Sequence, residues 1–185
     1  RRGILIKGGS HLERAALIDI VAVDKTGTLT VGKPSLTEIV TVDGVHAMGE
    51  SLPAEVAALL RLAAALEAKS EHPLAHAIVK GALDCGIASP EVTDFQATPG
   101  KGAEGNVDGL RVVVGSERLF RELEVSRFEA IENLSRPLQQ MGKTCVWMGL
   151  REGDRVTAKA VMVMADTIRA EARTLTNDLH QLGVR

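Results

Sequence analysis

The fold is decided by residues 18–30, whose sequence reads IDIVAVDKTGTLT. Residues 18–23 form a short, β-branched apolar run that ends at Asp24 and a turn over residues 25–27. Such a run predicts a strand covered on both faces, as in a parallel α/β sheet. Open α/β sheets place their functional sites at the carboxyl ends of their strands. Asp24 is therefore the first candidate for a reacting side chain.

The residues around Asp24 suit phosphoryl transfer. A carboxylate at this position can attack phosphorus and form an aspartyl phosphate. Lys25, Thr26 and Thr28 supply hydrogen-bond donors, and Gly27 lets backbone amides approach the phosphoryl oxygens. The carboxylate can also share a Mg²⁺ ion with the phosphate, which lowers the charge repulsion. A turn-capping aspartate beside solvated threonines is the alternative. That alternative would explain an isolated Asp-x-Thr, but it does not explain these seven consecutive residues.

The rest of the chain predicts helices and antiparallel hairpins between two α/β ends. Asp108-Gly109 is the dipeptide of a tight hairpin turn, and Pro73 opens a helix with His72 at its cap position and Gly86 as its stop. Strands are predicted over residues 35–42, 103–107, 110–114, 144–150 and 155–164, and helices over residues 53–69, 73–85, 117–123, 128–141 and 168–182.

This order of elements is typical of an inserted domain. The predicted fold class is α/β with an α+β insert, in which an antiparallel sheet with flanking helices is bracketed by pieces of a parallel α/β domain. The boundaries are drawn at residues 1–34, 35–163 and 164–185.

Composition excludes several classes of function. The 22 Lys and Arg residues against 24 Asp and Glu give a net charge of -2, and aromatic residues are only 2% of the chain. Neither feature favours nucleic-acid binding. No run reaches the roughly 18 apolar residues that a membrane helix needs, so the chain as given is expected to be soluble. Cys85 and Cys145 lie far apart, outside any zinc or disulfide pattern.

Residues 24–30, DKTGTLT, resemble the phosphorylation signature of the P-type ATPases, cation pumps of the haloacid dehalogenase superfamily. Residues 70–74, SEHPL, are similar to a segment of the heavy-metal-transporting class, and Glu67 stands five residues before His72 as it does there. Gly100-Lys101-Gly102 and Gly115 resemble the glycine positions of that class. These motifs occur in the family's order along essentially the whole chain.

The resemblance implies an ATP or ADP site in the middle domain, formed by Glu67, His72, Gly100, Gly102 and Gly115. The His72 ring would stack on adenine or hydrogen-bond to it, and Glu67 would accept from the exocyclic amine. Taken alone, the histidine is explained as a helix cap and the glycines as turn residues, and these roles are compatible with nucleotide binding. Ser116 stands where the class usually has asparagine.

Asp166 has two interpretations. As an aspartate before an amphipathic run, it is expected to cap the last helix. The resemblance adds a contact with bound nucleotide at the hinge between the domains.

The resemblance also implies that ATP phosphorylates Asp24 in an intact pump that moves a heavy-metal cation. Asp24 and Thr26 would then hold Mg²⁺. The partners would be the pump's membrane helices, actuator domain and remaining phosphorylation domain, and the chain would be a cytoplasmic part of a plasma- or inner-membrane protein. Zinc, cadmium or cobalt is slightly favoured over copper. As a truncated piece, the chain would expose apolar surface, which leaves self-association open, and it would bind nucleotide without full turnover.

Two alternatives remain at the level of sequence. A soluble phosphatase of the same superfamily would normally carry a second aspartate two residues after Asp24, where this chain has Thr26. A non-catalytic nucleotide-binding module is the other.

Overall fold

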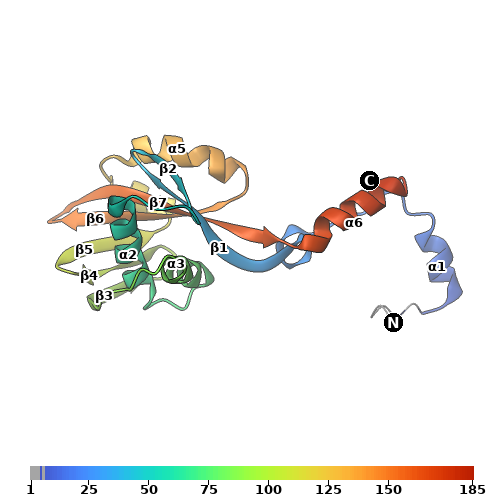
Figure 1. The fold of residues 1–185 in the computed structure, drawn as a ribbon, viewed down its shortest axis with the longest axis horizontal. Helices are drawn as coiled ribbons and strands as arrows, with labels where there is room; N and C mark the ends of the chain where they lie inside the picture. The colour runs from blue at the N-terminus through green and yellow to red at the C-terminus, as the bar shows by residue number, and fades with distance from the viewer. Residues whose placement is uncertain (1–4, 6) are drawn as a thin grey trace. The chain divides into compact units, whose positions relative to one another are not determined.

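The structure is a computed structural model that describes residue 5 and residues 7–185, without the side chains of Lys25 and Thr26. Its contacts divide the chain into two compact units (Figure 1). Unit 1 combines Arg1–Gly32 with Thr167–Arg185, and unit 2 is Lys33–Asp166. The sequence-based boundaries of the middle domain, residues 35 and 163, lie within three residues of the limits of unit 2.

In the described residues, seven strands form one sheet in the order β2-β1-β7-β6-β5-β4-β3. The neighbours from β3 to β7, and the pair β1–β2, are antiparallel. The strand bounds are β1 Thr30–Thr41, β2 Gly44–Ala47, β3 Val92–Thr98, β4 Gly102–Val107, β5 Leu110–Gly115, β6 Thr144–Glu152 and β7 Arg155–Ile168. The predicted antiparallel sheet is confirmed, and β2 and β3 are strands that the sequence analysis did not identify.

Local turn chemistry sets the central hairpins. Asp108 and Gly109 join β4 to β5 with φ of 49° and 79°. Two successive positive φ values are typical of the type I′ hairpin turn that Asp-Gly favours. The predicted turn is confirmed.

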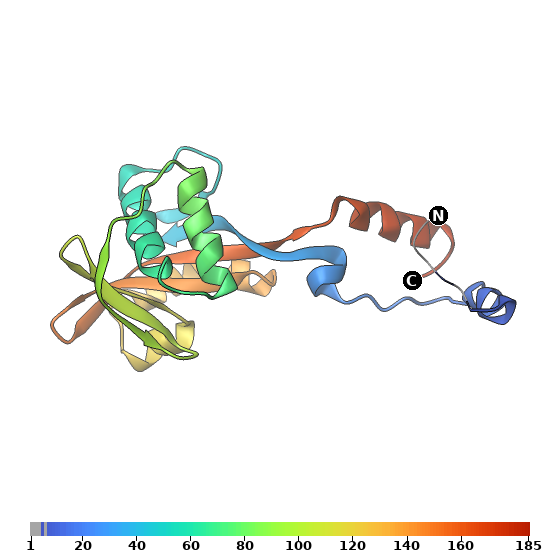
Figure 2. The ribbon, with the colours of Figure 1, turned by 90° about the horizontal axis from the view of Figure 1, so that it is seen from below.

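Four helices cover the two faces of the sheet in unit 2 (Figures 1 and 2). On one face α2 (Ala54–Glu67) and α3 (Pro73–Asp84) pack against a buried cluster that includes Met148. On the other, α4 (Glu117–Glu122) and α5 (Phe128–Gln140) pack around Trp147. Trp147 and Met148 are consecutive in β6. Because successive side chains of a strand point to opposite faces of the sheet, one packs into each of the two hydrophobic clusters. None of the helices in the described part of the chain is long and apolar enough to cross a membrane.

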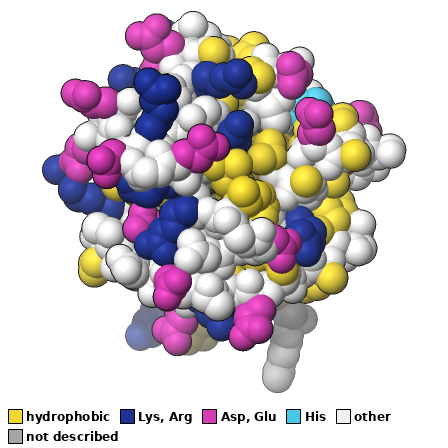
Figure 3. Space-filling view, turned by 90° about the vertical axis from the view of Figure 1, so that its left-hand side faces the viewer, with side chains coloured by type: hydrophobic (Ala, Val, Ile, Leu, Met, Phe, Trp, Pro, Cys, Tyr) yellow, Lys and Arg dark blue, Asp and Glu magenta, His cyan; other side chains and the backbone are white. Residues whose placement is uncertain are grey.

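Ion pairs reinforce the register of the central strands. Glu104 on β4 accepts from Arg111 on β5 at 2.6 Å and from Arg151 on β6 at 3.2 Å. Burial acts to raise the pKa of Glu104, but the hydrogen bonds and charges of the two arginines outweigh it and lower that pKa. Figure 3 shows acidic and basic side chains interspersed on the face that it presents.

Unit 1 contains α1 (Gly9–Ala15), a π-helix over Lys25–Leu29 and α6 (Ala170–Gln181). The Val21 amide donates to Arg185 O at 2.7 Å, and the Arg185 amide donates to Asp19 O at 2.8 Å. This pattern is that of parallel strands. Residues 18–23 are nevertheless not a strand, and Ile20 is 60% exposed. The prediction that this run is a strand covered on both faces is therefore wrong for the described chain, whereas the expectation of exposed apolar surface is confirmed by Ile18, Ile20 and Val21.

Candidate functional site

A cavity of about 590 Å³ lies in unit 2, where the end of α2, the start of α3 and the β3–β4 loop meet. All five residues predicted for the nucleotide site within the middle domain line it: Glu67, His72, Gly100, Gly102 and Gly115. They lie up to 48 positions apart in the sequence, so the fold brings them together. The volume is within the usual range of small-molecule sites, about 300–1,000 Å³.

His72 caps α3. Its Nδ1 accepts a hydrogen bond from the Leu74 amide at 3.2 Å, as the sequence predicts for a residue before the helix-opening Pro73. An acceptor at Nδ1 places the proton of the neutral ring on Nε2. The cap therefore orients the imidazole and leaves an N–H donor on its other side. The capping and binding roles use different nitrogens of one ring.

Glu67 is the last residue of α2 and is half-buried. Burial raises the pKa of its carboxyl to about 7, although a hydrogen bond with the Ser70 side chain acts to lower it. A helix C-terminus carries partial negative charge, which also disfavours an ionised carboxylate. Near neutral pH this side chain can therefore both donate and accept hydrogen bonds.

Ser70 connects the two predicted polar residues of the cavity. Its Oγ accepts from the His72 amide at 3.3 Å, and its side chain hydrogen-bonds Glu67. Because a hydroxyl has one proton, that proton is free to go to Glu67. The Ser70 amide also donates to Glu67 O at 2.9 Å. The turn between α2 and α3 is thus fixed around one serine.

At two of the glycines, the backbones of neighbouring strands in the cavity wall lie too close together to leave room for a side chain. Gly102 and Gly115 are paired across β4 and β5. A Cβ on Gly102 would lie 2.2 Å from Val114 O, and one on Gly115 would lie 2.5 Å from Lys101 O. Gly100 has open space around it but a φ of +72°. The first two positions therefore exclude a side chain by contact, and the third by backbone conformation.

Other residues of the cavity were not selected from the sequence. Phe95 on β3 presents an aromatic ring, and Cys145 on β6 is a thiol whose pKa burial raises to about 11. Lys101 also lines the cavity, with Nζ 2.5 Å from Glu122. The SEHPL segment could have indicated Ser70. Nothing in the sequence marked Phe95 as a cavity residue, apart from its being one of 3 phenylalanines.

Ser116, which replaces the asparagine usual in the resembling class, also lines the cavity. Its Oγ accepts from the Leu119 amide at 3.3 Å and caps α4. Its amide donates to Lys101 O at 2.8 Å, which ties the β3–β4 loop to the end of β5. The side-chain oxygen is thus engaged in the helix cap.

Asp166 does not cap the last helix, and that prediction is wrong. It lies inside β7, which continues to Ile168, and its Oδ1 accepts from the Lys33 amide at 3.1 Å. The helix begins only at Ala170, with Arg169 at its N-cap. Cross-strand pairing between β1 and β7 extends the strand past the aspartate. Asp166 does not line the cavity described above.

The second predicted site lies in unit 1. Asp24 is exposed and directly precedes the π-helix, and Thr28 is exposed within it. The side chains of Lys25 and Thr26 lie outside the described residues. The Gly27 amide donates to Thr30 Oγ1 at 3.2 Å, which closes the turn after the aspartate.

Arg169 fixes the end of this loop. Its side chain donates to Thr30 O at 3.0 Å and to Gly27 O at 3.2 Å, and its amide donates to Leu29 O at 2.9 Å. Three carbonyls of the turn are thus held by one residue. This role follows from the fold and could not be found from spacing.

The described residues contain no group of three or more His, Cys, Asp or Glu side chains that could hold a metal ion. Asp24 is the one predicted Mg²⁺ ligand whose side chain is described.

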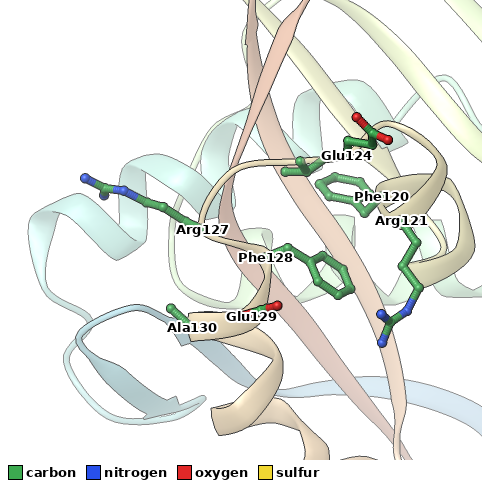
Figure 4. Close-up of a pocket in the computed structure, with 8 residues that line it drawn as sticks. Phe120, Arg121, Glu124, Arg127, Phe128, Glu129 and Ala130 are labelled. Carbon is green, nitrogen blue, oxygen red and sulfur yellow. The ribbon is translucent and has the colours of Figure 1, made fainter.

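A second cavity, of about 520 Å³, lies around the loop between α4 and α5 (Figure 4). Phe120 and Phe128 point inward there, whereas Arg127 points away. Arg121 is engaged with Glu117 and Glu132 at 2.9 Å and 2.5 Å and lies 4.7 Å from the Phe128 ring. None of the residues predicted for a site lies in this cavity.

Comparison with known proteins identifies the relatives of this chain. A probable cadmium-transporting ATPase of Staphylococcus aureus (strain MRSA252) is 38% identical over 188 residues, covering 100% of this chain and 24% of the relative. The copper-exporting P-type ATPase B of Archaeoglobus fulgidus is 40% identical over 185 residues, again covering 100% and 24%. The chain therefore spans about a quarter of the length of these relatives.

Solved structures agree with these relatives. A zinc-transporting PIB-type ATPase in its E2.Pi state aligns over 100% of this chain and 28% of its own, with a TM-score of 0.76 and 38% identity. The catalytic domain of the CPx-ATPase CopB-B aligns over 97% of this chain and 55% of its own, with a TM-score of 0.62 and 25% identity. The resemblance to heavy-metal P-type ATPases is confirmed.

The sequence profile described as haloacid dehalogenase-like hydrolase matches residues 18–185. That match covers both units, including the Asp24 loop and the cavity of unit 2. The chain belongs to the haloacid dehalogenase-like hydrolases, and within them it corresponds to part of the heavy-metal P-type ATPases.

Proposed function

We propose that unit 2 binds ATP and ADP, with the adenine ring in the 590 Å³ cavity. The observation that carries this proposal is the convergence of Glu67, His72, Gly100, Gly102 and Gly115 on one cavity. A cleft with apolar walls and a few convergent polar groups is the general form of a small-molecule site. The catalytic domain of CopB-B changes conformation upon nucleotide binding, which adds support.

Each lining group has a chemical use for adenine. The Phe95 ring offers a face for stacking, His72 Nε2 offers a donor, and Glu67 can meet the amino edge of the base. The Gly102–Gly115 pair leaves the wall without side chains, so a flat ligand can lie against backbone. Lys101 places a cation at the same rim, where phosphates carry negative charge.

In the full-length protein, we propose that ATP transfers its γ-phosphoryl group to Asp24. P-type ATPases and related hydrolases use nucleotide and Mg²⁺ in general, and Asp24 and Thr26 are the residues of this chain that we assign to the ion. When bound, Mg²⁺ would reduce the repulsion between the carboxylate and the phosphates. The Asp24 carboxylate would be the nucleophile, and the Gly27 backbone would approach the transferred oxygens.

The assembled protein would be a membrane pump for a heavy-metal cation, with this chain on its cytoplasmic side. The relatives are named for cadmium, copper and zinc, so the class of cargo is proposed without choosing one metal. The partners of the chain would be the membrane helices, the actuator domain and the remaining phosphorylation domain of the same pump.

Calorimetric titration of the 185-residue chain with ADP tests the binding proposal. Glu67→Ala should weaken binding by about 1–3 kcal/mol, the cost of losing a buried polar partner. His76→Ala is the matched control, because His76 is an exposed residue of α3 outside the cavity. Equal affinity of the parent chain and the Glu67 variant, or no binding by the parent chain, would reject the assignment.

A further inference from the structure

The environment of Glu67 favours a neutral side chain. Glu67 is the last residue of α2, where the helix carries partial negative charge, and the last turn of α2 contains no basic residue to compensate it. The hydrogen bond with the Ser70 side chain acts the other way and lowers the pKa of the carboxyl, but burial has the larger effect. Around it the cavity is lined by apolar groups, among them Leu74, Phe95 and Ala103.

The charged and titratable residues around the cavity do not offset this environment. The elements packed most closely against α2 are α3, β3, β4 and β5, and their residues that line the cavity are uncharged. The remaining titratable lining residues are Lys69, Glu71, His72, Lys101 and Cys145. Lys101 is paired with Glu122, while Lys69 and Glu71 are exposed. The Cys145 thiol stays protonated near neutrality because burial raises its pKa to about 11.

We propose that Glu67 recognises adenine as a neutral carboxylic acid, whose hydroxyl donates to N1 while its carbonyl oxygen accepts from the N6 amine. This inference rests on the proposed nucleotide site and specifies how that site selects its base. Adenine presents an acceptor at N1 beside a donor at N6, and a carboxylic acid presents the complementary pair. An ionised carboxylate could accept from N6, but its second oxygen would oppose the N1 lone pair.

The Ser70 hydroxyl completes the arrangement. A carbonyl oxygen has two lone pairs, so it can accept from Ser70 and from the N6 amine together. The side chain of Ser70 hydrogen-bonds that of Glu67, and its backbone amide donates to Glu67 O at the helix end. Ser70 is thus a positioning residue for the acid. The burial that raises the pKa of Glu67 to about 7 supports the same protonation state.

Adenosine binding to the 185-residue chain, measured by equilibrium dialysis against pH, tests the proposal. Adenosine has no phosphate, so the ligand does not change charge near neutrality. The expected result is an affinity about tenfold lower at about pH 8 than at about pH 6, because binding needs the proton that Glu67 loses in this range. Glu67→Gln supplies the same acceptor and donor at every pH, so its affinity should stay within about twofold across the range and exceed that of the parent chain at about pH 8.

Two controls isolate the groups involved. 1-Deazaadenosine lacks the N1 acceptor, so it should bind about tenfold more weakly than adenosine at about pH 6 and show no pH dependence. His72→Asn keeps a capping oxygen and removes the imidazole, and this variant should retain the pH dependence of the parent chain.

The outcomes separate the two proposals. Adenosine binding that is independent of pH, or that Glu67→Gln weakens at about pH 6, would overturn the neutral-acid mechanism and leave the nucleotide site standing. Failure of the parent chain to bind adenosine or ADP at any pH would overturn the site itself and the inference with it.

Discussion

Gly102 and Gly115 face each other across β4 and β5 so closely that a Cβ on Gly102 would lie 2.6 Å from the Cα of Gly115. The pair joins the β3–β4 loop to the end of β5, and both residues line the cavity. The Glu104 ion pairs with Arg111 and Arg151 hold the same strands in register. The pairing of β4 with β5 therefore forms this wall of the proposed adenine site.

Gly102→Ala should destabilise the chain by more than about 2 kcal/mol, because backbone atoms of β5 occupy the space of the new Cβ. Gly153→Ala is the control. Gly153 also has a positive φ, +58°, but open space around it, so the cost should be about 1 kcal/mol. Urea unfolding of both variants measures the difference. Equal costs would show that close contact between the glycines is not what requires Gly102.

His72→Ala should lower both stability and nucleotide affinity, because it removes the α3 cap and the ring together. Loss of an N-cap costs about 0.5–2 kcal/mol. His72→Asn should restore the stability, since asparagine caps well, without restoring the affinity. Thermal unfolding and ADP titration of both variants check this separation. If the asparagine variant bound ADP as tightly as the parent chain, the imidazole would have no role beyond capping.

Glu67 should make the stability of the chain depend on pH. Its pKa is raised from 4.5 to about 7 in the folded chain, so folding favours the protonated form. The associated stability is complete below about pH 4.5 and is lost as the pH rises through about 7, an amount of about 1–3 kcal/mol after allowing for partial exposure. Urea unfolding between about pH 5 and about pH 8 measures it. Glu67→Gln should remove this component, and an unchanged slope in that variant would assign it to another group.

Asp24→Asn in the full-length protein should abolish phosphorylation by ATP while leaving ATP affinity within about twofold. Asparagine keeps the shape of the side chain and removes the nucleophilic charge, and the adenine site is assigned to unit 2. Acid-stable, hydroxylamine-labile radiolabel measures the phosphoenzyme. Asp19→Asn is the control and should leave the label intact. Label on the Asp24 variant would exclude this residue as the acceptor.

The sequence was most informative where local chemistry decides the structure. The Asp108-Gly109 turn, the His72 cap and the stop at Gly86, whose φ is +72°, each depend on a few neighbouring residues. The Asp166 prediction was wrong because β7, which neighbours β1 in the sheet, continues to Ile168, where the helix was expected to begin. Residues 18–23 differ for the same reason, since covering a strand requires neighbours that no local pattern supplies.

In the candidate site, too, the sequence indicated some residues and the fold was needed to find the others. Glu67, His72 and the glycines could be named together only through a resemblance that preserves their order. Phe95 and Cys145 join them in the cavity because β3 and β6 lie where the sheet places them. Ser70 lies within the SEHPL segment, but its hydrogen bonds with Glu67 and with the His72 amide could be found only from the structure.

Amide chemical-shift mapping of the ¹⁵N-labelled chain during an ADP titration tests the central claim most directly. Two cavities of similar volume, about 590 Å³ and 520 Å³, lie in the same unit, so the experiment has a built-in comparison. The account predicts that the largest shifts occur at Glu67, Ser70, Gly100, Gly102 and Gly115, with small shifts at residues 120–130. The largest shifts at residues 120–130, with the glycines unmoved, would contradict it.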